Sequence, residues 1–224
     1  MREPDEDMLV DPVDGEPLGP RARRIAKEVA AVPGLTGFER AVALAGRLHE
    51  HQRRKGTDIP YIAHLLAVAS IVIEDGGTET QAIAALLHDA PEDQGGMAAL
   101  EAIRSLFGDE VAAIVESCTD AFEHPKPPWK ERKARYLERL RQEPRGVLRV
   151  SLADKVHNAG AIVQDLEAHG AAVWERFNVG PDEQLWYYRS LVEIFGVRHP
   201  SPRSEELRRL VDRMAQLREG KRDP

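Results

Sequence analysis

The stretch TQAIAALLHDAPED at residues 80–93 begins as an apolar segment and ends in polar groups. Alanine and leucine at its start favour a buried helix. Its last six positions carry one imidazole and three carboxylates, on His88, Asp89, Glu92 and Asp93. A charge buried at the end of a core helix is costly unless it is paired or bound to a metal ion. The stretch therefore predicts both a helical core and a metal site at its edge.

The composition is typical of an α-helical protein. The chain has 224 residues, of which 42% are hydrophobic and only 5% are aromatic. This length is enough for a sizeable core, and abundant alanine and leucine with few aromatic residues favour helices over sheets. The sequence contains neither an alternating strand pattern nor an internal repeat. We therefore predict an all-α fold with a single domain over residues 21–220.

Negative charge is concentrated at the N-terminus. The formal net charge is −7, and residues 1–20 contain seven acidic residues against Arg2 alone. The same segment is rich in proline and glycine and has no apolar period, so we expect a disordered acidic tail over residues 1–20. The remainder is close to neutral, which argues against a nucleic-acid-binding surface.

Cysteine content and hydropathy indicate the compartment. Cys118 is the only cysteine of the sequence, so a disulfide framework within the chain is excluded. No stretch approaches the roughly 18–20 apolar residues that cross a bilayer, and the acidic N-terminus lacks a signal-peptide pattern. We therefore expect a cytoplasmic protein without a membrane partner.

Capping residues and helix breakers divide the chain into helices. A T-x-x-E box at Thr36 is expected to open a helix that runs to about Arg54, and Thr78 with Gln81 to open the helix of the quoted stretch. Pro91 is expected to force a tight turn between the pair His88-Asp89 and the pair Glu92-Asp93, which keeps these four groups together. The other predicted helices cover residues 21–32, 62–75, 97–108, 109–120, 130–142, 149–168, 181–196 and 203–219, with a proline-rich loop at 123–130.

Two further apolar helices are interrupted by residues of metal-ligand type. His64 lies in PYIAHLLAVA (60–69), and Asp154 lies in SLADKVHNAGAI (151–162), with Asn158 one turn later on the same face. Imidazole and carboxylate together suit Mn²⁺, Fe²⁺, Co²⁺ or Zn²⁺. We predict one divalent-ion site with room for water. Its predicted ligands are His64, His88, Asp89 and Asp154.

Three segments, RRKGTDIPYIAH, ALLHDAPED and SLADKVHN, resemble in order and spacing the hydrolase domain of RelA/SpoT-type alarmone enzymes. That domain belongs to the HD superfamily of metal-dependent phosphohydrolases, so the resemblance implies a compact multi-helix HD-domain fold. It extends from about Phe38 to about Phe195 and leaves no space for the synthetase and regulatory domains of the long enzymes. We therefore expect a small stand-alone hydrolase, similar to the metazoan relatives of SpoT.

The resemblance also implies a reaction. It is the removal of the 3′-pyrophosphate from a guanosine alarmone, (p)ppGpp, to give GDP or GTP and pyrophosphate, with Mn²⁺ as the usual metal. The alternatives are an adenosine alarmone hydrolase, a 5′-nucleotidase, a phosphodiesterase, and a non-catalytic alarmone-binding protein. Because the family includes antitoxins, a cognate alarmone synthetase or toxin is a candidate partner, and the oligomeric state stays open.

Individual roles carry over by match to the family motifs. His64, His88, Asp89 and Asp154 match metal ligands. Glu92 and Asp93 match the pair that orients and deprotonates the attacking water, and Asn158 matches an asparagine that assists Glu92 and holds a phosphate or water. Basic groups compensate the charge of the pyrophosphates, and an aromatic ring contacts the base. The candidate substrate contacts are Arg54, Lys55, Lys126, Lys130, Trp186 and Tyr187.

The sequence departs from the family pattern at a few positions near the predicted site. Leu65 replaces the usual proline after the motif's histidine, and Ala90 with Pro91 replaces two apolar residues. Gln94 stands where threonine is common. No ligand is lost, so the resemblance still implies a metal site, whereas Pro91 is expected to affect the orientation of Glu92.

Overall fold

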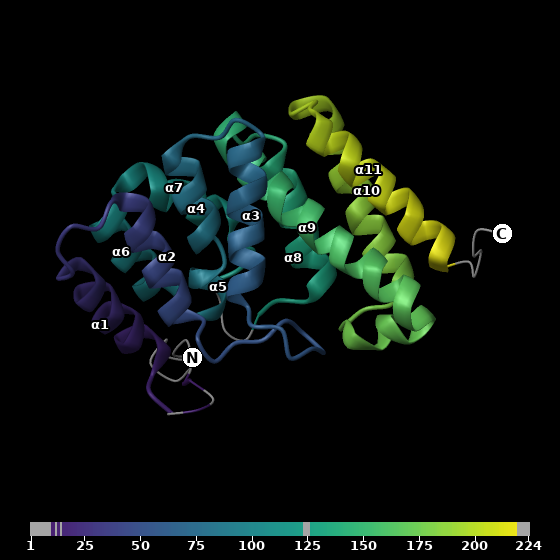
Figure 1. Ribbon diagram of the computed structural model, residues 1–224. Helices are drawn as coiled ribbons and strands as arrows, with labels where there is room; N and C mark the ends of the chain where they lie inside the picture. The colour runs from purple at the N-terminus through teal and green to yellow at the C-terminus, as the bar shows by residue number, and fades with distance from the viewer. Residues whose placement is uncertain (1–9, 12, 14, 123–125, 219–224) are drawn as a thin grey trace. The chain divides into compact units, whose positions relative to one another are not determined.

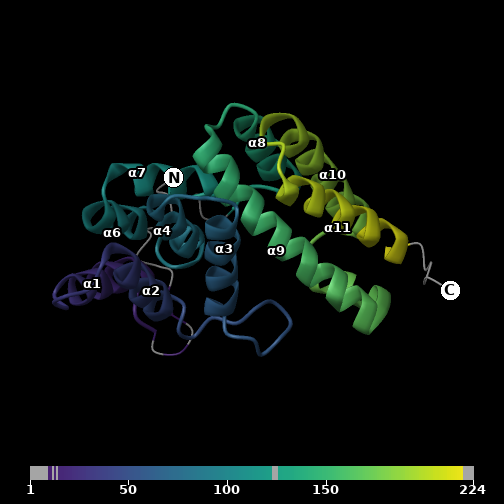
Figure 2. The same cartoon turned by 45° about the horizontal axis from the view of Figure 1, so that its top comes forward.

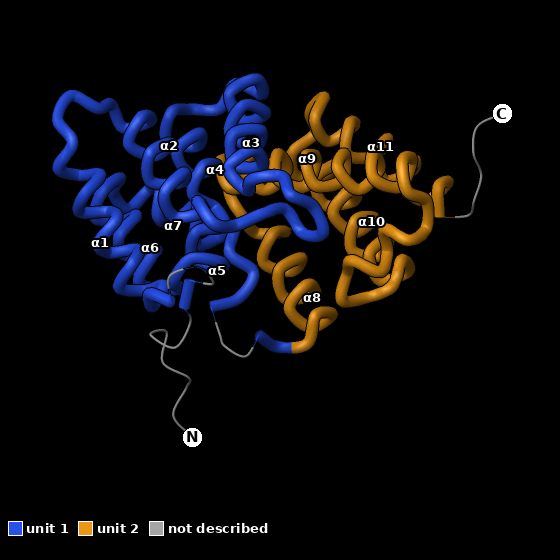
Figure 3. The backbone as a smooth tube through the Cα atoms, turned by 60° about the horizontal axis from the view of Figure 1, so that its bottom comes forward, with its two compact units in different colours: residues 1–127 blue, residues 128–224 orange. Residues whose placement is uncertain are grey.

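The computed structural model describes residues 10, 11, 13, 15–122 and 126–218, and the statements below refer to these residues. Their regular elements are helices, and the extended pairing among them is limited to two isolated bridges, Val10 with Pro17 and Arg53 with Pro60. The all-α prediction is confirmed. None of the described helices combines the length and the apolar character required to span a bilayer. The chain divides into two compact units, residues 1–127 and 128–224 (Figure 3).

The quoted stretch forms the centre of the first unit. Its helix α4 packs against α2, α3 and α7, and its residues 84–87 are completely buried. Alanine at several of these positions lets the neighbouring helices approach closely. The helices of this unit are α1 (Leu18–Ala30), α2 (Gly37–Leu48), α3 (Ile62–Glu74), α4 (Glu79–Leu87), α5 (Ala90–Asp93), α6 (Gly96–Phe107) and α7 (Asp109–Cys118) (Figure 1).

Both predicted capping boxes are present, but α2 ends earlier than expected. The side chains of Thr36 and Thr78 accept hydrogen bonds from the backbone three residues later, and each box is closed by the reciprocal bond. The predicted helix end near Arg54 is wrong, because α2 stops at Leu48. Residues 52–61 instead form a loop, within which Gly56 adopts a positive φ of 73°. A hydrogen bond of 3.0 Å from the backbone N–H of Tyr61 to the carbonyl oxygen of Gln52 closes this loop.

Where a tight turn was predicted at Pro91, the chain forms the short helix α5. The chain leaves α4 after Leu87 and restarts as α5, with Pro91 in its first turn, where the missing N–H leaves no helical hydrogen bond unmade. The backbone N–H of Asp93 donates to the carbonyl of Asp89 at 3.0 Å. The acidic pair therefore projects from a one-turn helix directly after the His-Asp pair.

The second unit is also helical. It contains α8 (Trp129–Leu140), α9 (Arg145–His169), a 3₁₀ helix η2 (Gly170–Arg176), α10 (Pro181–Arg198) and α11 (Pro202–Arg218), and α11 packs along α9 and α10 (Figure 2). Helix α9 begins at Arg145, before the predicted residue 149, and Pro144 is its N-cap residue. The 3₁₀ helix η2 was not predicted. Helix α10 continues through Gly196, where we expected it to end, since a helical conformation is accessible to glycine and buried Phe195 anchors this turn.

The N-terminal segment differs from the disordered tail expected over residues 1–20. Asp11 is buried, and its Oδ2 lies 3.7 Å from Nε of Arg21, whose guanidinium is also buried and donates to the carbonyl of Leu48 at 2.9 Å. Helix α1 begins at Leu18. Buried charges require such partners. The contact between Asp11 and Arg21 therefore fixes the position of the described residues before α1. For residues 1–9, 12 and 14 the expectation lies outside the described residues, and the single domain over 21–220 stays a prediction.

Candidate metal centre

Two buried imidazoles lie around one carboxylate in the first unit. His64 is in the first turn of α3, His88 follows α4, and their ring centroids are 5.4 Å apart. Nε2 of His88 lies 3.1 Å from Oδ2 of Asp89, and Nε2 of His64 lies 3.5 Å from the same oxygen. The three ligands that the sequence predicts for this unit therefore lie together.

The chemistry of this group fits a bound cation. Nδ1 of His88 lies 2.7 Å from the carbonyl oxygen of Ala85, so this nitrogen carries a proton and donates it. A neutral ring then presents its Nε2 lone pair toward the Asp89 carboxylate. A lone pair and a carboxylate oxygen repel each other at 3.1 Å unless a proton or a metal cation lies between them. Nitrogen and oxygen donors of this kind suit a first-row divalent ion.

Tyr61 holds the carboxylate of Asp89. Its hydroxyl donates to Oδ2 at 2.6 Å, and its ring stacks on His49 with centroids 5.2 Å apart and planes 19° from parallel. Partners of this kind fix the orientation of ligand side chains. The family motifs that we matched in the sequence assign no role to His49 or to Tyr61. The position of Tyr61 just before His64 in the Y-I-x-H motif was the signal that could have found it.

Glu92 is held by residues from the segment after α7. Nζ of Lys126 lies 2.8 Å from Oε1 of Glu92, and the backbone N–H of Asp120 donates to Oε2 at 3.4 Å. Both side chains of the ion pair are only partly buried. The sequence predicts Lys126 as a substrate contact, and the structure places its ammonium group on the predicted general base.

Asp93 lies next to Glu92 on α5 and, like it, is partly buried. Nε2 of Gln52 donates to Oδ2 of Asp93 at 2.8 Å. Burial, followed by the negative charges of Asp89 and Glu92, raises the pKa of Asp93 to about 7, against the opposing effects of Gln52 and Lys126. Near neutral pH this carboxyl group can therefore both accept and release a proton.

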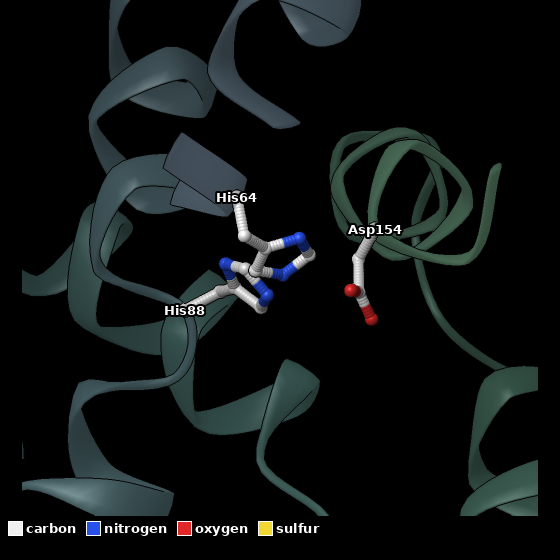
Figure 4. Close-up of side chains that lie close together, drawn as sticks. All are labelled: His64, His88 and Asp154. Carbon is white, nitrogen blue, oxygen red and sulfur yellow. The ribbon is translucent and has the colours of Figure 1, made fainter. Parts of the chain in front are cut away.

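In the second unit, Asp154 lies buried on α9 with both carboxylate oxygens hydrogen-bonded. Oδ1 accepts from Nδ2 of Asn158 at 2.5 Å, and Oδ2 accepts from Nζ of Lys155 at 2.5 Å. Burial alone would lower the pKa of Lys155. The charge of Asp154, together with Tyr187 and Tyr136, outweighs this effect, so the pKa of Lys155 is raised. Side chains that can bind a metal ion are drawn in Figure 4; they are His64 and His88 of the first unit and Asp154 of the second.

The basic loop before α3 carries two predicted substrate contacts, Arg54 and Lys55, which differ in their exposure to solvent. The guanidinium of Arg54 lies over the ring of Tyr61, 5.8 Å from its centroid, and Arg54 is half-buried. Lys55 is exposed on the same loop. Arg54 is thus packed against the residue that holds Asp89, whereas Lys55 faces solvent.

Aromatic rings and lysines gather at the start of α8 and on α10. Nζ of Lys130 lies 5.6 Å from the ring centroid of Trp186, and Nζ of Lys133 lies 5.1 Å from that of Tyr187. The ring of Trp129 meets both aromatic residues edge-on. Trp186 is partly exposed and Tyr187 is buried, so Trp186 is the better placed of the two to meet a ligand.

Comparison with known families gives a match across more than half of the chain. The family described as "HD domain" matches residues 41–179. This range carries all four predicted ligands and the acidic pair. It also runs through parts of both units.

Curated relatives fall into long and short proteins. A probable GTP pyrophosphokinase of Mycobacterium leprae is 38% identical over 136 residues, which are 60% of this chain and 17% of the relative. The mouse protein named guanosine-3′,5′-bis(diphosphate) 3′-pyrophosphohydrolase MESH1 is 34% identical over 62% of this chain and 74% of its own length. Its Xenopus tropicalis counterpart is 40% identical over 53% and 65%. The chain thus spans only a small part of the long bacterial relatives that it matches.

Two solved structures have a similar fold. One is described as a metazoan ortholog of SpoT that hydrolyses ppGpp; it has a TM-score of 0.64 at 24% identity and covers 81% of this chain and 97% of its own. The other is a crystal structure of a Listeria monocytogenes protein, with a TM-score of 0.60 at 35% identity over 66% of this chain and 96% of its own. Both likenesses indicate a shared multi-helix fold.

Proposed function

Because the chain belongs to the HD-domain family, whose fold the sequence predicted, we propose that it is a metal-dependent hydrolase of guanosine alarmones. It would remove the 3′-pyrophosphate of (p)ppGpp to leave GDP or GTP. The observation that carries the proposal is the arrangement in the first unit, where two imidazoles surround Asp89 and α5 presents Glu92 and Asp93 directly after it. The names of the animal relatives support the substrate class.

We propose that one divalent ion is held by two imidazoles and two carboxylates. The inclusion of Asp154 is supported by its burial and by the hydrogen bonds that orient both of its oxygens. When bound, the ion would supply the Lewis acidity that activates water and polarises a phosphoryl oxygen. We propose Mn²⁺, and the same donor set also accommodates other transition metals. The proposed ligands are His64, His88, Asp89 and Asp154.

The acids of α5 would move the protons. Glu92 accepts a proton from the attacking water as general base, and Lys126 keeps its carboxylate in place. Water adds to the phosphorus attached to the ribose 3′ oxygen, the bond between them breaks, and the 3′ oxygen leaves with a proton. Asp93 can supply that proton near neutral pH, because its pKa lies at about 7. Asn158 supports Asp154 and would hold a phosphate or water.

Basic and aromatic side chains would bind the substrate. A bis(diphosphate) carries several negative charges, which basic side chains can compensate, and a purine can stack on an aromatic face. The residues that we propose for these contacts are Arg54, Lys55, Lys126, Lys130, Trp186 and Tyr187. A cytoplasmic location and a cognate synthetase or toxin stay predictions from the sequence.

The proposal is tested by a substrate panel. Protein stripped with EDTA is assayed before and after addition of Mn²⁺ with ppGpp, its adenosine analogue, a deoxynucleoside monophosphate and a cyclic nucleotide. We expect Mn²⁺-dependent release of pyrophosphate and GDP from ppGpp. Hydrolysis of the monophosphate or the cyclic nucleotide with ppGpp left intact would contradict the alarmone proposal. Preference for the adenosine analogue would overturn the base assignment, and tight ppGpp binding without turnover would overturn the catalytic one.

A further inference from the structure

A hydrogen-bond chain connects the end of α2 to Asp93. Nδ1 of His49 lies 2.6 Å from Oε1 of Gln52, and Nε2 of Gln94 donates to the same oxygen at 2.7 Å. The amide of Gln52 then donates from Nε2 to Oδ2 of Asp93 at 2.8 Å. None of the first three residues belongs to the proposed ligands, acids or substrate contacts. The chain lies entirely within the first unit.

The direction of these bonds is set by His49. Burial lowers the pKa of His49 to about 4, so its ring is neutral at physiological pH and carries one proton. Its Nε2 is buried and makes no hydrogen bond to any residue that the structure describes. A proton on Nε2 would leave a buried donor unsatisfied and would set two lone pairs against each other at the Gln52 oxygen. The proton therefore lies on Nδ1 and is donated to Gln52.

The orientation of the Gln52 amide follows from its two donors. Because both His49 and Gln94 donate to Oε1, the carbonyl side of the amide is committed to them. The NH₂ side must then face Asp93, where it meets a carboxylate oxygen. Rotation of the amide by 180° would place an oxygen against that carboxylate and an NH₂ group against two donors. The buried neighbours thus permit one orientation only.

We propose that Gln52 is a positioning residue, which holds the Asp93 carboxylate for the hydrolytic reaction, and that His49 and Gln94 act through it. The proposal rests on the proposed function of the site. A catalytic carboxylate must be held within a fraction of an ångström, and outer residues with locked rotamers supply that precision. His49 adds a second support, since its ring also stacks on Tyr61, which holds Asp89.

The first test replaces the amide alone. Gln52→Met keeps the length of the side chain and removes both hydrogen-bonding atoms, and we expect kcat for ppGpp to fall about 10–100-fold. KM and the Mn²⁺ content should stay within about twofold of wild type, because Gln52 is neither a proposed metal ligand nor a proposed substrate contact. Gln164→Met is the matched control, as this glutamine is exposed on α9. An unchanged kcat in a folded Gln52→Met protein would overturn the proposal.

The second test asks whether His49 acts through Gln52. His49→Phe keeps a ring on Tyr61 but removes the Nδ1 proton, and it should lower kcat several-fold in the wild-type background. In the Gln52→Met background the same change should have no further effect on kcat, since coupled residues are not additive. Additive losses would show that His49 does not act through the amide. Gln94→Met repeats the test if the His49 variant fails to fold.

A structural measurement separates this proposal from the proposed function. Crystal structures of wild type and Gln52→Met should show the Asp93 carboxylate displaced or in several conformations in the variant. An unmoved carboxylate would overturn the positioning role whatever the protein hydrolyses. Conversely, wild-type protein without alarmone turnover, but with Asp93 displaced in the variant, would overturn only the proposed function.

Discussion

Nζ of Lys126 lies 2.8 Å from Oε1 of Glu92, so a residue predicted to bind substrate contacts the residue predicted to act as base. A substrate phosphate would compete with Glu92 for this ammonium group. The lysine can therefore serve both partners, orienting the carboxylate before substrate binds and compensating phosphate charge afterwards. The partial exposure of both side chains leaves room for that exchange.

Loss of this cation should slow the reaction. We expect Lys126→Met to lower kcat/KM for ppGpp about tenfold or more, with Lys126→Arg keeping most of the activity because the charge remains. Steady-state kinetics with Mn²⁺ give the values, and Lys27→Met on the exposed face of α1 is the control. Wild-type kcat/KM in Lys126→Met would show that the ion pair has no part in the reaction.

Removal of the Tyr61 hydroxyl should weaken metal binding. Tyr61→Phe deletes the donor to Oδ2 of Asp89 and keeps the ring that stacks on His49. Loss of such a partner typically weakens metal affinity about 10–100-fold. Calorimetric titration of EDTA-treated protein with Mn²⁺ measures the dissociation constants of the variant and wild type. Equal dissociation constants for the variant and wild type would contradict a ligand role for Asp89.

Asp93 should destabilise the metal-free protein at alkaline pH. Its pKa is raised to about 7 in the folded chain from 3.8, so the folded state binds its proton more tightly and stability falls as pH rises between these values. Asp93→Asn should therefore increase the free energy of unfolding at pH 8 by up to about 4 kcal/mol, with the gain disappearing near pH 4. Urea denaturation in EDTA at both pH values tests this. A variant less stable than wild type at pH 8 would contradict it.

His49 should destabilise the folded protein at acidic pH, whereas Asp93 does so at alkaline pH. Its pKa is lowered to about 4 in the folded chain from 6.5, so the unfolded state takes up the proton first and stability is lost as pH falls from 6.5 toward 4. The loss attributable to this residue is about 3 kcal/mol over the interval. His49→Phe should therefore show a flatter dependence of unfolding free energy on pH. An unchanged slope would mean that His49 is not buried as a neutral ring.

The helical core could be predicted from the sequence because its signals are local. The apolar run of α4 and the capping boxes at Thr36 and Thr78 depend on residues within a few positions of each other, and the structure confirms them. The end of α2 depends instead on a loop that Gln52 and Tyr61 close through their backbones. Nothing in the local pattern fixes that closure, so the predicted helix ran too far.

The candidate site divides in the same way. His64, His88 and Asp154 stand out as ligand types within apolar helices, so periodicity alone finds them. The bond from Gln52 to Asp93 joins residues 41 positions apart, and that from Lys126 to Glu92 joins residues 34 positions apart. Such pairs depend on how the helices pack, which a single sequence does not specify.

Glu92→Gln tests the central claim most directly. Wild type and variant are loaded with Mn²⁺, and the bound metal and the rate of pyrophosphate release from ppGpp are measured on the same samples. We predict one ion per chain in both proteins and a loss of turnover of at least about 100-fold in the variant, since the amide cannot accept the proton. Turnover by the variant at the wild-type rate, or wild-type protein that hydrolyses ppGpp equally well without metal, would contradict the account.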